Sequence, residues 1–210
     1  MMSRLMILAA PLALAACSAA VAAPAAPSPS PSASAPAALL PGEVSGGTFR
    51  SWAAGADAVT YDTAAVPEGA KILFSTEETD DTTVVRLTAL GLAPSRGYGA
   101  HLHLNPCGKL PDDAGPHYQQ EVDPAAGPGK PSVDPEYANP ENEVWLDFTT
   151  DAHGTGAATA EQNWHFDAGR PAWSVVLHTE HTHTDPGEAG QAGARVACLT
   201  RHSQYSKPAR

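Results

Sequence analysis

The chain has 210 residues, enough for one folded domain and some additional sequence. Twelve Lys and Arg residues against 23 Asp and Glu give a formal charge of −11, which argues against nucleic acid as a partner. The negative charge also opposes the approach of an anionic substrate, so such a substrate needs local positive charge at its site. No segment after residue 16 reads as a membrane-spanning helix.

Residues 1–16 have the pattern of a secretory signal. Arg4 is followed by an apolar run, rich in Leu and Ala, that is too short to span a bilayer. The run ends at Cys17, and residues 14–17 resemble the lipobox of bacterial lipoproteins, in which the thiol is lipidated. We therefore expect an exported protein that is lipid-anchored through Cys17 on the outer face of the cell membrane, in a bacterial envelope. The alternative is an ordinary signal peptide that is cut a few residues later.

The segment after Cys17 has the composition of a tether. Residues 18–41 are nearly all Ala, Pro and Ser, with too few large apolar side chains to offset the entropy of ordering them. We expect a lipidated Cys and tether over residues 17–44, a folded domain over 45–202 and a solvated tail over 203–210. Loss of the signal, which contains Arg4, makes the formal charge −12.

The predicted domain has the pattern of an all-β protein. Short runs of β-branched and aromatic residues alternate with Gly, Pro and Asp, and several of them alternate apolar with polar positions. Strands at fairly regular spacing predict an antiparallel sandwich or barrel. A polar segment rich in Pro and Gly, residues 118–142, predicts a long loop that is either functional or mobile. The runs that we expect to form strands lie at residues 58–61, 70–74, 82–90, 144–149 and 174–178.

Two histidines at positions i and i+2 are the sharpest local signal. On a strand His101 and His103 project from one face, while Leu102 points to the other. Two imidazoles on one face suit a transition metal such as copper or zinc. Taken alone, the pair also fits two surface histidines on an edge strand. Cys107 and Cys198 remain as a pair if Cys17 is lipidated, and in an exported protein such a pair indicates a disulfide.

Five separate elements together resemble the copper/zinc superoxide dismutase family. They occur in the family's order, and the likeness covers roughly residues 45–200. The resemblance implies a Greek-key antiparallel β-barrel or sandwich with long loops. The elements are a GxHxH strand with His101 and His103, Cys107 shortly afterwards, an AGPH element ending at His117, an apolar strand ending at His178, and a GxRxAC run from Gly193 to Cys198.

The resemblance also implies an enzyme, an exported copper superoxide dismutase. Superoxide would be converted to oxygen and hydrogen peroxide by one-electron cycling of the metal. Arg195 would hold the anion beside the copper, and its guanidinium suits that task because it is always charged. Without its neighbours in the motif, Arg195 would fit a surface ion pair equally well. The disulfide would attach the loop of Cys107 to the last strand, and the copper ligands would be His101, His103, His117 and His178, of which His117 would also carry a proton.

The sequence departs from the family at the zinc site. The family takes two further His and an Asp from the region after the bridging histidine, but residues 118–151 contain no His. Carboxylates such as Asp123 and Asp134 alone make a poor zinc site, so we expect copper without family-type zinc. In the loop after His178, Asp185 is the nearest counterpart of the family's Asp that links the two metal sites.

Five other histidines have no place in the family pattern, and we expect one of them, His202, in the tail. His181 and His183 are either a second, exposed metal-capture site or solvated loop residues. We expect His153 in a turn and His165 as a packed strand residue.

Two further functions remain open. One is a copper-binding protein that serves storage or tolerance at the cell surface without dismutase turnover, which the missing zinc loop and the extra histidines favour. The other is a structural envelope domain with a degenerate site.

Overall fold

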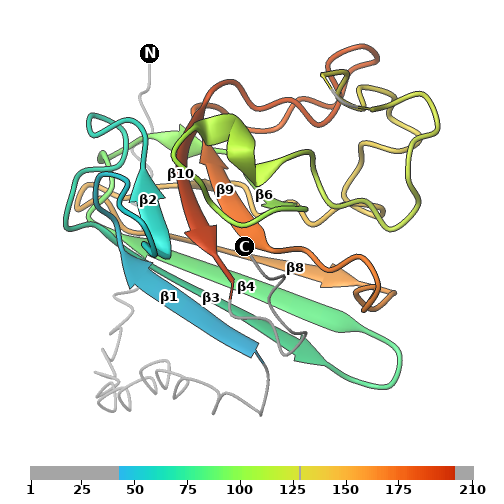
Figure 1. The fold of residues 1–210 in the computed structure, drawn as a ribbon, viewed down its shortest axis with the longest axis horizontal. Coiled ribbons are helices and arrows are strands. Elements are labelled where there is room, and N and C mark those ends of the chain that lie inside the picture. The colour runs from blue at the N-terminus through green and yellow to red at the C-terminus, as the bar shows by residue number, and fades with distance from the viewer. Residues whose placement is uncertain (1–42, 128, 202–210) are drawn as a thin grey trace, which may run out of the picture. The chain divides into compact units, whose positions relative to one another are not determined.

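The computed structural model describes residues 43–127 and 129–201, whose fold is shown in Figure 1. The predicted signal, Cys17, nearly all of the tether and the tail lie outside these residues, as does His202. Two four-stranded antiparallel sheets enclose the core, and a two-stranded sheet lies beside them. The predicted all-β sandwich is therefore confirmed. None of the described residues forms a helix that is long and apolar enough to cross a membrane.

The first sheet has the strand order β1-β3-β4-β8. Its buried and exposed positions alternate, most clearly along β4, where Thr83, Val85, Leu87 and Ala89 are buried and their neighbours face outward. This period of two gives each strand one core face and one solvent face. The strands are β1 (Glu43–Thr48), β3 (Lys71–Glu78), β4 (Thr83–Leu90) and β8 (Gly156–Gln162).

The second sheet has the order β2-β10-β9-β6 and carries the histidine motifs. The chain leaves the first sheet after β4, forms β6 in the second sheet, and returns to place β8 beside β4. This crossover gives the predicted Greek-key arrangement. The strands of this sheet are β2 (Ala58–Thr60), β6 (Ala100–His103), β9 (Ser174–His178) and β10 (Arg195–Thr200). In the two-stranded sheet β5 (Gly97–Tyr98) pairs with β7 (Phe148–Thr149). The 3-10 helix η1 spans Pro111–Ala114.

The second sheet is covered on both faces, which is why every residue of β9 is buried. Leu102, Val175 and Leu177 face the core between the sheets. Burying each such side chain contributes roughly 1.5–3 kcal/mol. The opposite face carries the histidines and is covered by the loop that contains η1. Its apolar contacts form a second cluster of Val59, Cys107, Ala114, Val176 and Cys198.

A buried ion pair joins the two ends of the domain. Arg201 is 4% exposed and its guanidinium donates to Glu43 at 3.1 Å and to the carbonyl of Ala172 at 2.8 Å. The guanidinium also lies 4.9 Å from the ring centroids of Phe74 and Phe166. The ion pair thus attaches β1, which contains Glu43, to the residue that follows β10.

Most predicted runs form strands, with differences at two places. Only the last two residues of the run 144–149 form a strand, because the earlier ones pair with β6 through isolated contacts such as the bridge between Trp145 and His101. The expectation for His165 was wrong. His165 is exposed and lies after β8 ends, and its ring contacts the hydroxyl of Thr83 and the carbonyl of Asp80. His153 lies in a turn, as predicted.

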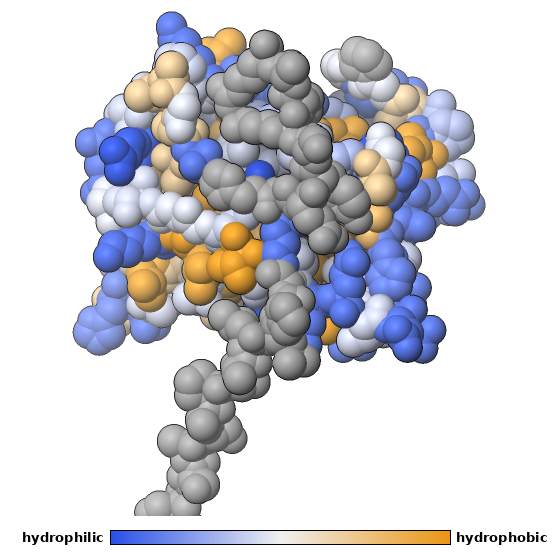
Figure 2. All heavy atoms as spheres, turned by 60° about the horizontal axis from the view of Figure 1, so that its bottom comes forward, coloured by the Kyte–Doolittle hydropathy of each residue, from blue (hydrophilic) through white to orange (hydrophobic). Residues whose placement is uncertain are grey.

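The outer face of the first sheet is mainly hydrophilic. Figure 2, in which the lower side of Figure 1 comes forward, shows several separate hydrophobic areas among polar side chains. The exposed large hydrophobic residues of this sheet are Val44 on β1, Leu73 on β3 and Leu90 on β4. Such scattered apolar residues are ordinary on a soluble surface.

Candidate metal centre

Strand register brings three of the four predicted histidine ligands to one face. In the antiparallel pair β6–β9, His101 lies opposite Val176 and His103 lies opposite Ser174. Opposite residues of such a pair project to the same side, and His178 follows Val176 by two residues, so it shares that side. The pairing of two strands that are 70 residues apart in the chain thus assembles most of the site.

His117 reaches the same place from the loop after η1. Its segment runs along the free edge of β6, where the backbone N–H of Tyr118 donates to the carbonyl of Leu102 at 2.8 Å, and His117 forms a bridge with His103. In the pairs that His117 or His178 forms with another of the four imidazoles, the ring centroids are 4.3–6.0 Å apart. One nitrogen of each lies within 4.8 Å of the corresponding nitrogens of the others, and this is the one such group of three or more among the described residues.

Hydrogen bonds fix the proton position on His103 and His178. Nδ1 of His103 lies 2.9 Å from the carbonyl oxygen of Gly115, and Nδ1 of His178 lies 3.3 Å from that of Gly193. A carbonyl only accepts, so each Nδ1 carries the proton and each Nε2 holds a lone pair. Both Nε2 atoms are buried without a hydrogen-bond partner.

His101 has the opposite arrangement. Its Nε2 lies 2.7 Å from the hydroxyl oxygen of Thr182, and that hydroxyl in turn lies 2.7 Å from Oδ1 of Asp147. The hydroxyl has one proton, which goes to the carboxylate because an ionised carboxylate only accepts. The hydroxyl oxygen must therefore accept from Nε2 of His101. Nδ1 of His101 keeps the lone pair, and it too is buried and has no partner.

His117 is held by a buried carboxylate. Its Nδ1 donates to Oε2 of Glu143 at 2.9 Å, which leaves Nε2 as the nitrogen with a lone pair. Glu143 is 1% exposed and also accepts from Trp145 Nε1 at 2.8 Å and from Gln119 Nε2 at 2.9 Å. All four imidazoles are thus oriented by a second group, as in protein metal sites.

The four residues fit a copper ion. An unpaired nitrogen costs free energy when it is buried, yet three of them converge here, and a bound cation removes that cost. Imidazole is a ligand suited to copper and zinc. In this arrangement Nδ1 of His117 is already engaged by Glu143.

Burial keeps three of these histidines neutral. Desolvation, followed by repulsion from His117, holds the pKa of His101 and of His103 well below the ordinary value. The same two causes lower the pKa of His178 to about 3. The charge of Arg195 lowers all three values further. Metal ligation needs the neutral ring, so these histidines are ready to bind at neutral pH.

The lowered pKa values predict acid sensitivity of the metal-free protein. In the unfolded chain these histidines take up protons below about pH 6.5, while in the folded chain they stay neutral to far lower pH. The unfolded state therefore binds more protons, and stability falls as the pH drops below about 6.5, on the order of 1 kcal/mol per pH unit for each histidine. We expect the melting temperature of the metal-free protein to fall between pH 7 and pH 5, and to fall less in His178→Asn. A melting temperature that is constant over this range would contradict the prediction.

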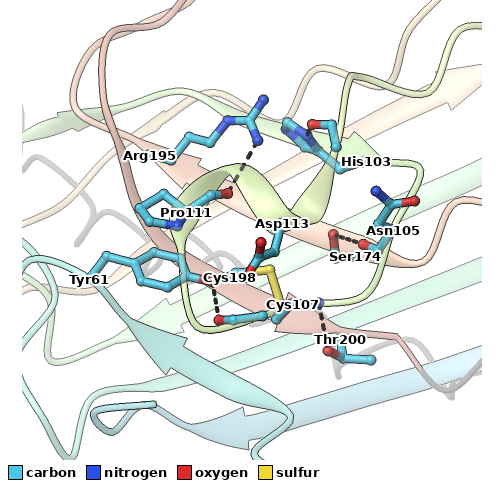
Figure 3. Close-up of a disulfide and its surroundings, with 12 residues drawn as sticks. Tyr61, His103, Asn105, Cys107, Pro111, Asp113, Ser174, Arg195, Cys198 and Thr200 are labelled. Atoms are coloured by element: carbon cyan, nitrogen blue, oxygen red, sulfur yellow. Dashed lines mark hydrogen bonds between the residues drawn. A yellow bond between two sulfur atoms is a disulfide. The ribbon is translucent and has the colours of Figure 1, made fainter. Parts of the chain in front are cut away.

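Arg195 is placed at the site by its strand and by the disulfide loop. It pairs with His178 across β9 and β10, and a register shift follows it before Ala197. Such bulges re-aim side chains next to functional sites. Its guanidinium donates to the carbonyl of Pro111 at 3.2 Å, and Figure 3 shows the side chain extending over Pro111 toward His103.

The expected disulfide joins that loop to β10. Cys107 and Cys198 are bonded and buried, with a sequence separation of 91. Around them the N–H of Cys107 donates to the hydroxyl of Thr200 at 3.1 Å, and the hydroxyl of Tyr61 donates to the carbonyl of Gly108 at 3.0 Å (Figure 3). The bridge therefore holds the backbone that orients Arg195.

A cavity of about 310 Å³ opens over the site. His117, His178 and Arg195 line it, together with two further cations, Lys130 and Arg170. These cations supply positive charge in an otherwise acidic domain. The loop after His178, residues 179–192, contains no Lys or Arg. Positive charge at this site therefore comes from the other walls of the cavity.

The interpretation of Asp185 was wrong. Asp185 is exposed, and its backbone carbonyl accepts from the N–H of Glu188. The contact with His101 is made instead by Thr182, which Asp147 holds.

His181 and His183 have separate partners rather than a shared one. His181 Nε2 lies 3.0 Å from the hydroxyl of Thr149, while the two ring nitrogens of His183 contact Glu180 and Glu188. The two carboxylates raise the pKa of His183. Both nitrogens of His183 are thus engaged by carboxylates, so this arrangement does not support a second metal site.

Sequence reasoning missed Glu143, Thr182 and Asp147. Each is an ordinary polar residue in a polar segment. Each comes close to the histidines only through a hydrogen bond to a residue 26 or more positions away in the chain. The absence of His from residues 118–151 was the one available sign that another group contacts Nδ1 of His117.

Comparisons with known proteins give a distant structural likeness. No family model and no curated protein matches the chain. Cu/Zn superoxide dismutase from Brucella abortus is 19% identical with a TM-score of 0.47, and the match covers 75% of this chain and 99% of that one. A double mutant of a SOD-like protein from Bacillus subtilis is 16% identical with a TM-score of 0.46, over 61% and 86% of the two chains. Such values assign neither family nor activity, so the function has to be argued from the site.

Proposed function

We propose that this chain is an exported, copper-dependent superoxide dismutase that works without zinc. The observation that carries the proposal is the convergence of four imidazoles whose lone pairs face one another, three of them from buried nitrogens without another partner. Copper bound there would supply one-electron oxidation of one superoxide to oxygen and one-electron reduction of a second, with uptake of two protons, to hydrogen peroxide. The protein contributes binding, access, charge and protons.

Arg195 binds the substrate anion in this proposal. One of its nitrogens is held by the carbonyl of Pro111, and the others remain to donate to a small anion in the cavity. Lys130 and Arg170 add positive charge on the walls of the same cavity. Because the chain as a whole is negative, this local charge decides whether an anion enters, and the rate should depend on ionic strength.

His117 is the residue that moves a proton. Nε2 faces the other three ligands, while Nδ1 keeps its proton on Glu143. Nε2 of His117, where it holds a lone pair, could accept a proton, and the buried carboxylate of Glu143 would stabilise the resulting imidazolium. The role that a second metal would have in orienting His117 thus falls to this carboxylate.

The disulfide supports a location outside the cytoplasm, because disulfides persist in oxidising compartments. Lipid anchoring through Cys17 is part of the proposal and rests on the lipobox-like sequence alone.

Superoxide consumption by the purified, copper-loaded protein tests the function. We expect activity above that of the same amount of free copper, and a decrease of at least tenfold in Arg195→Ala, since the substrate anion loses its charge-assisted hydrogen bonds. Lys71→Ala, on the first sheet, is the matched control and should be unchanged. Activity no greater than that of free copper would exclude dismutation. If copper is nonetheless bound, the alternative of a copper storage or tolerance protein would be favoured.

A further inference from the structure

We propose that Asp147 and Thr182 are positioning residues that select the metal-binding nitrogen of His101. This inference rests on the proposed copper site and adds to it a specific hydrogen-bonded relay. His101 is the one ligand of the four that offers Nδ1 instead of Nε2. The proton of His101 lies on Nε2, whereas the other three rings carry it on Nδ1, so His101 needs a hydrogen-bond acceptor at Nε2.

Asp147 fixes the orientation of the Thr182 hydroxyl. Asp147 accepts twice from Thr182, from the backbone N–H through Oδ2 at 2.5 Å and from the hydroxyl through Oδ1 at 2.7 Å. This two-point contact fixes the residue as well as its proton. The hydroxyl oxygen then faces Nε2 of His101 at 2.7 Å as an acceptor. A proton on Nε2 is therefore favoured, and Nδ1 keeps its lone pair toward the other ligands.

The strand that carries the histidines is also attached to Asp147. The backbone N–H of Ala100 donates to Oδ1 of Asp147 at 3.3 Å, next to His101 itself. Asp147 lies in the segment just before β7, whereas Thr182 comes from the loop after β9. One carboxylate thus ties together β6, the start of β7 and the loop after β9.

Gly99 explains how the loop comes so close to β6. A side chain at this position would lie 2.6 Å from Cβ of Ala192, 2.6 Å from the carbonyl oxygen of Glu180 and 3.3 Å from the hydroxyl of Thr182. Only glycine lets the loop of residues 179–192 pack onto the backbone at this point. The glycine of the GxHxH motif therefore allows the contact between Thr182 and His101.

The contact of His101 with Thr182 and Asp147 differs in kind from the contacts of His103 and His178. His103 and His178 donate to backbone carbonyls, whose position a side-chain substitution does not change. His101 depends on a hydroxyl and a carboxylate, each of which can be altered singly. Loss of such an outer partner typically weakens metal affinity 10- to 100-fold.

Nitrogen NMR of histidine in the metal-free protein tests the relay without any activity measurement. In the wild type we expect His101 to show a proton on Nε2 and a lone pair on Nδ1. In Thr182→Val the acceptor is lost, and we expect the His101 nitrogen shifts to move toward a mixture of tautomers. Copper affinity, measured by competition with a chelator, should fall 10- to 100-fold. Asp147→Asn should change both readouts in the same direction.

Two variants control for general damage to the loop. Thr182→Ser keeps the hydroxyl and should restore the wild-type tautomer and affinity. Thr184→Val removes an exposed hydroxyl of the same loop and should change neither. A wild-type His101 protonated on Nδ1, or a Thr182→Val protein with unchanged shifts and affinity, would overturn the proposal. If the tautomer results hold but copper-loaded protein does not consume superoxide, the relay stands and the proposed dismutase function fails.

Discussion

Replacing Glu143 with alanine should destabilise the metal-free protein by about 3 kcal/mol or more. The carboxylate accepts from three nitrogens, those of His117, Gln119 and Trp145, in a place that is 1% exposed. Truncation leaves these donors without acceptors in a buried site, at roughly 1–3 kcal/mol for each one that finds no water. It also frees the His117 ring to rotate and to change tautomer, so copper affinity should fall by about 10- to 100-fold.

Urea denaturation and a copper competition titration measure the two effects of Glu143→Ala. The matched control is Glu141→Ala, because Glu141 lies two residues earlier with its side chain exposed. Its removal should change stability by less than about 0.5 kcal/mol. A Glu143→Ala protein as stable as the control, with wild-type copper affinity, would show that this carboxylate does not take over the orientation of His117.

Removing the disulfide should cost about 4–5 kcal/mol. The bridge closes a loop of 91 residues, and the loop-entropy relation gives this value for a loop of that length. A domain of this size is typically stable by only about 5–15 kcal/mol, so the double variant Cys107→Ala, Cys198→Ala should be close to unfolding at moderate temperature. The site should suffer as well, because the same loop supplies the carbonyls of Pro111 to Arg195 and of Gly115 to His103.

Denaturation of the wild type with and without a reductant provides the control for this variant. Reduction should lower the stability of the wild type toward that of the double variant and should leave the double variant unchanged. If the double variant unfolds within about 1 kcal/mol of the oxidised wild type, the bridge does not stabilise the fold as the loop relation requires.

The sequence predicted the fold class, because the strand pattern is local, whereas the proposed ligand set came from the family resemblance and stays a prediction. The period of two in the run 82–90 predicts β4, and the spacing of His101 and His103 places both on one face. β8 was missed because Gly156, Ala157 and Ala158 carry too little hydrophobic signal, and its strand state comes from pairing with β4. His165 lies between Trp164 and Phe166, a pattern that favoured a packed strand, but β8 already ends at Gln162.

The partners that orient the ligands could not be predicted. Glu143 meets His117 across 26 residues, and Thr182 meets His101 across 81. Asp185 matched the expected residue type in the expected loop, yet the close packing of that loop at Gly99 brings Thr182 to His101 instead. Such contacts follow from tertiary packing, which one sequence alone does not contain.

Copper binding by the four histidines is tested by the copper stoichiometry and the electron paramagnetic resonance spectrum of the copper-loaded protein. Both are measured in the wild type and in His178→Ala. We expect one tightly held copper per chain, with a spectrum typical of nitrogen ligands. We also expect His178→Ala to lose tight copper binding or to show a changed spectrum, together with loss of superoxide consumption. A wild type that releases its copper on dialysis, or a His178→Ala protein that keeps the wild-type stoichiometry and spectrum, would contradict a copper site built from these four histidines.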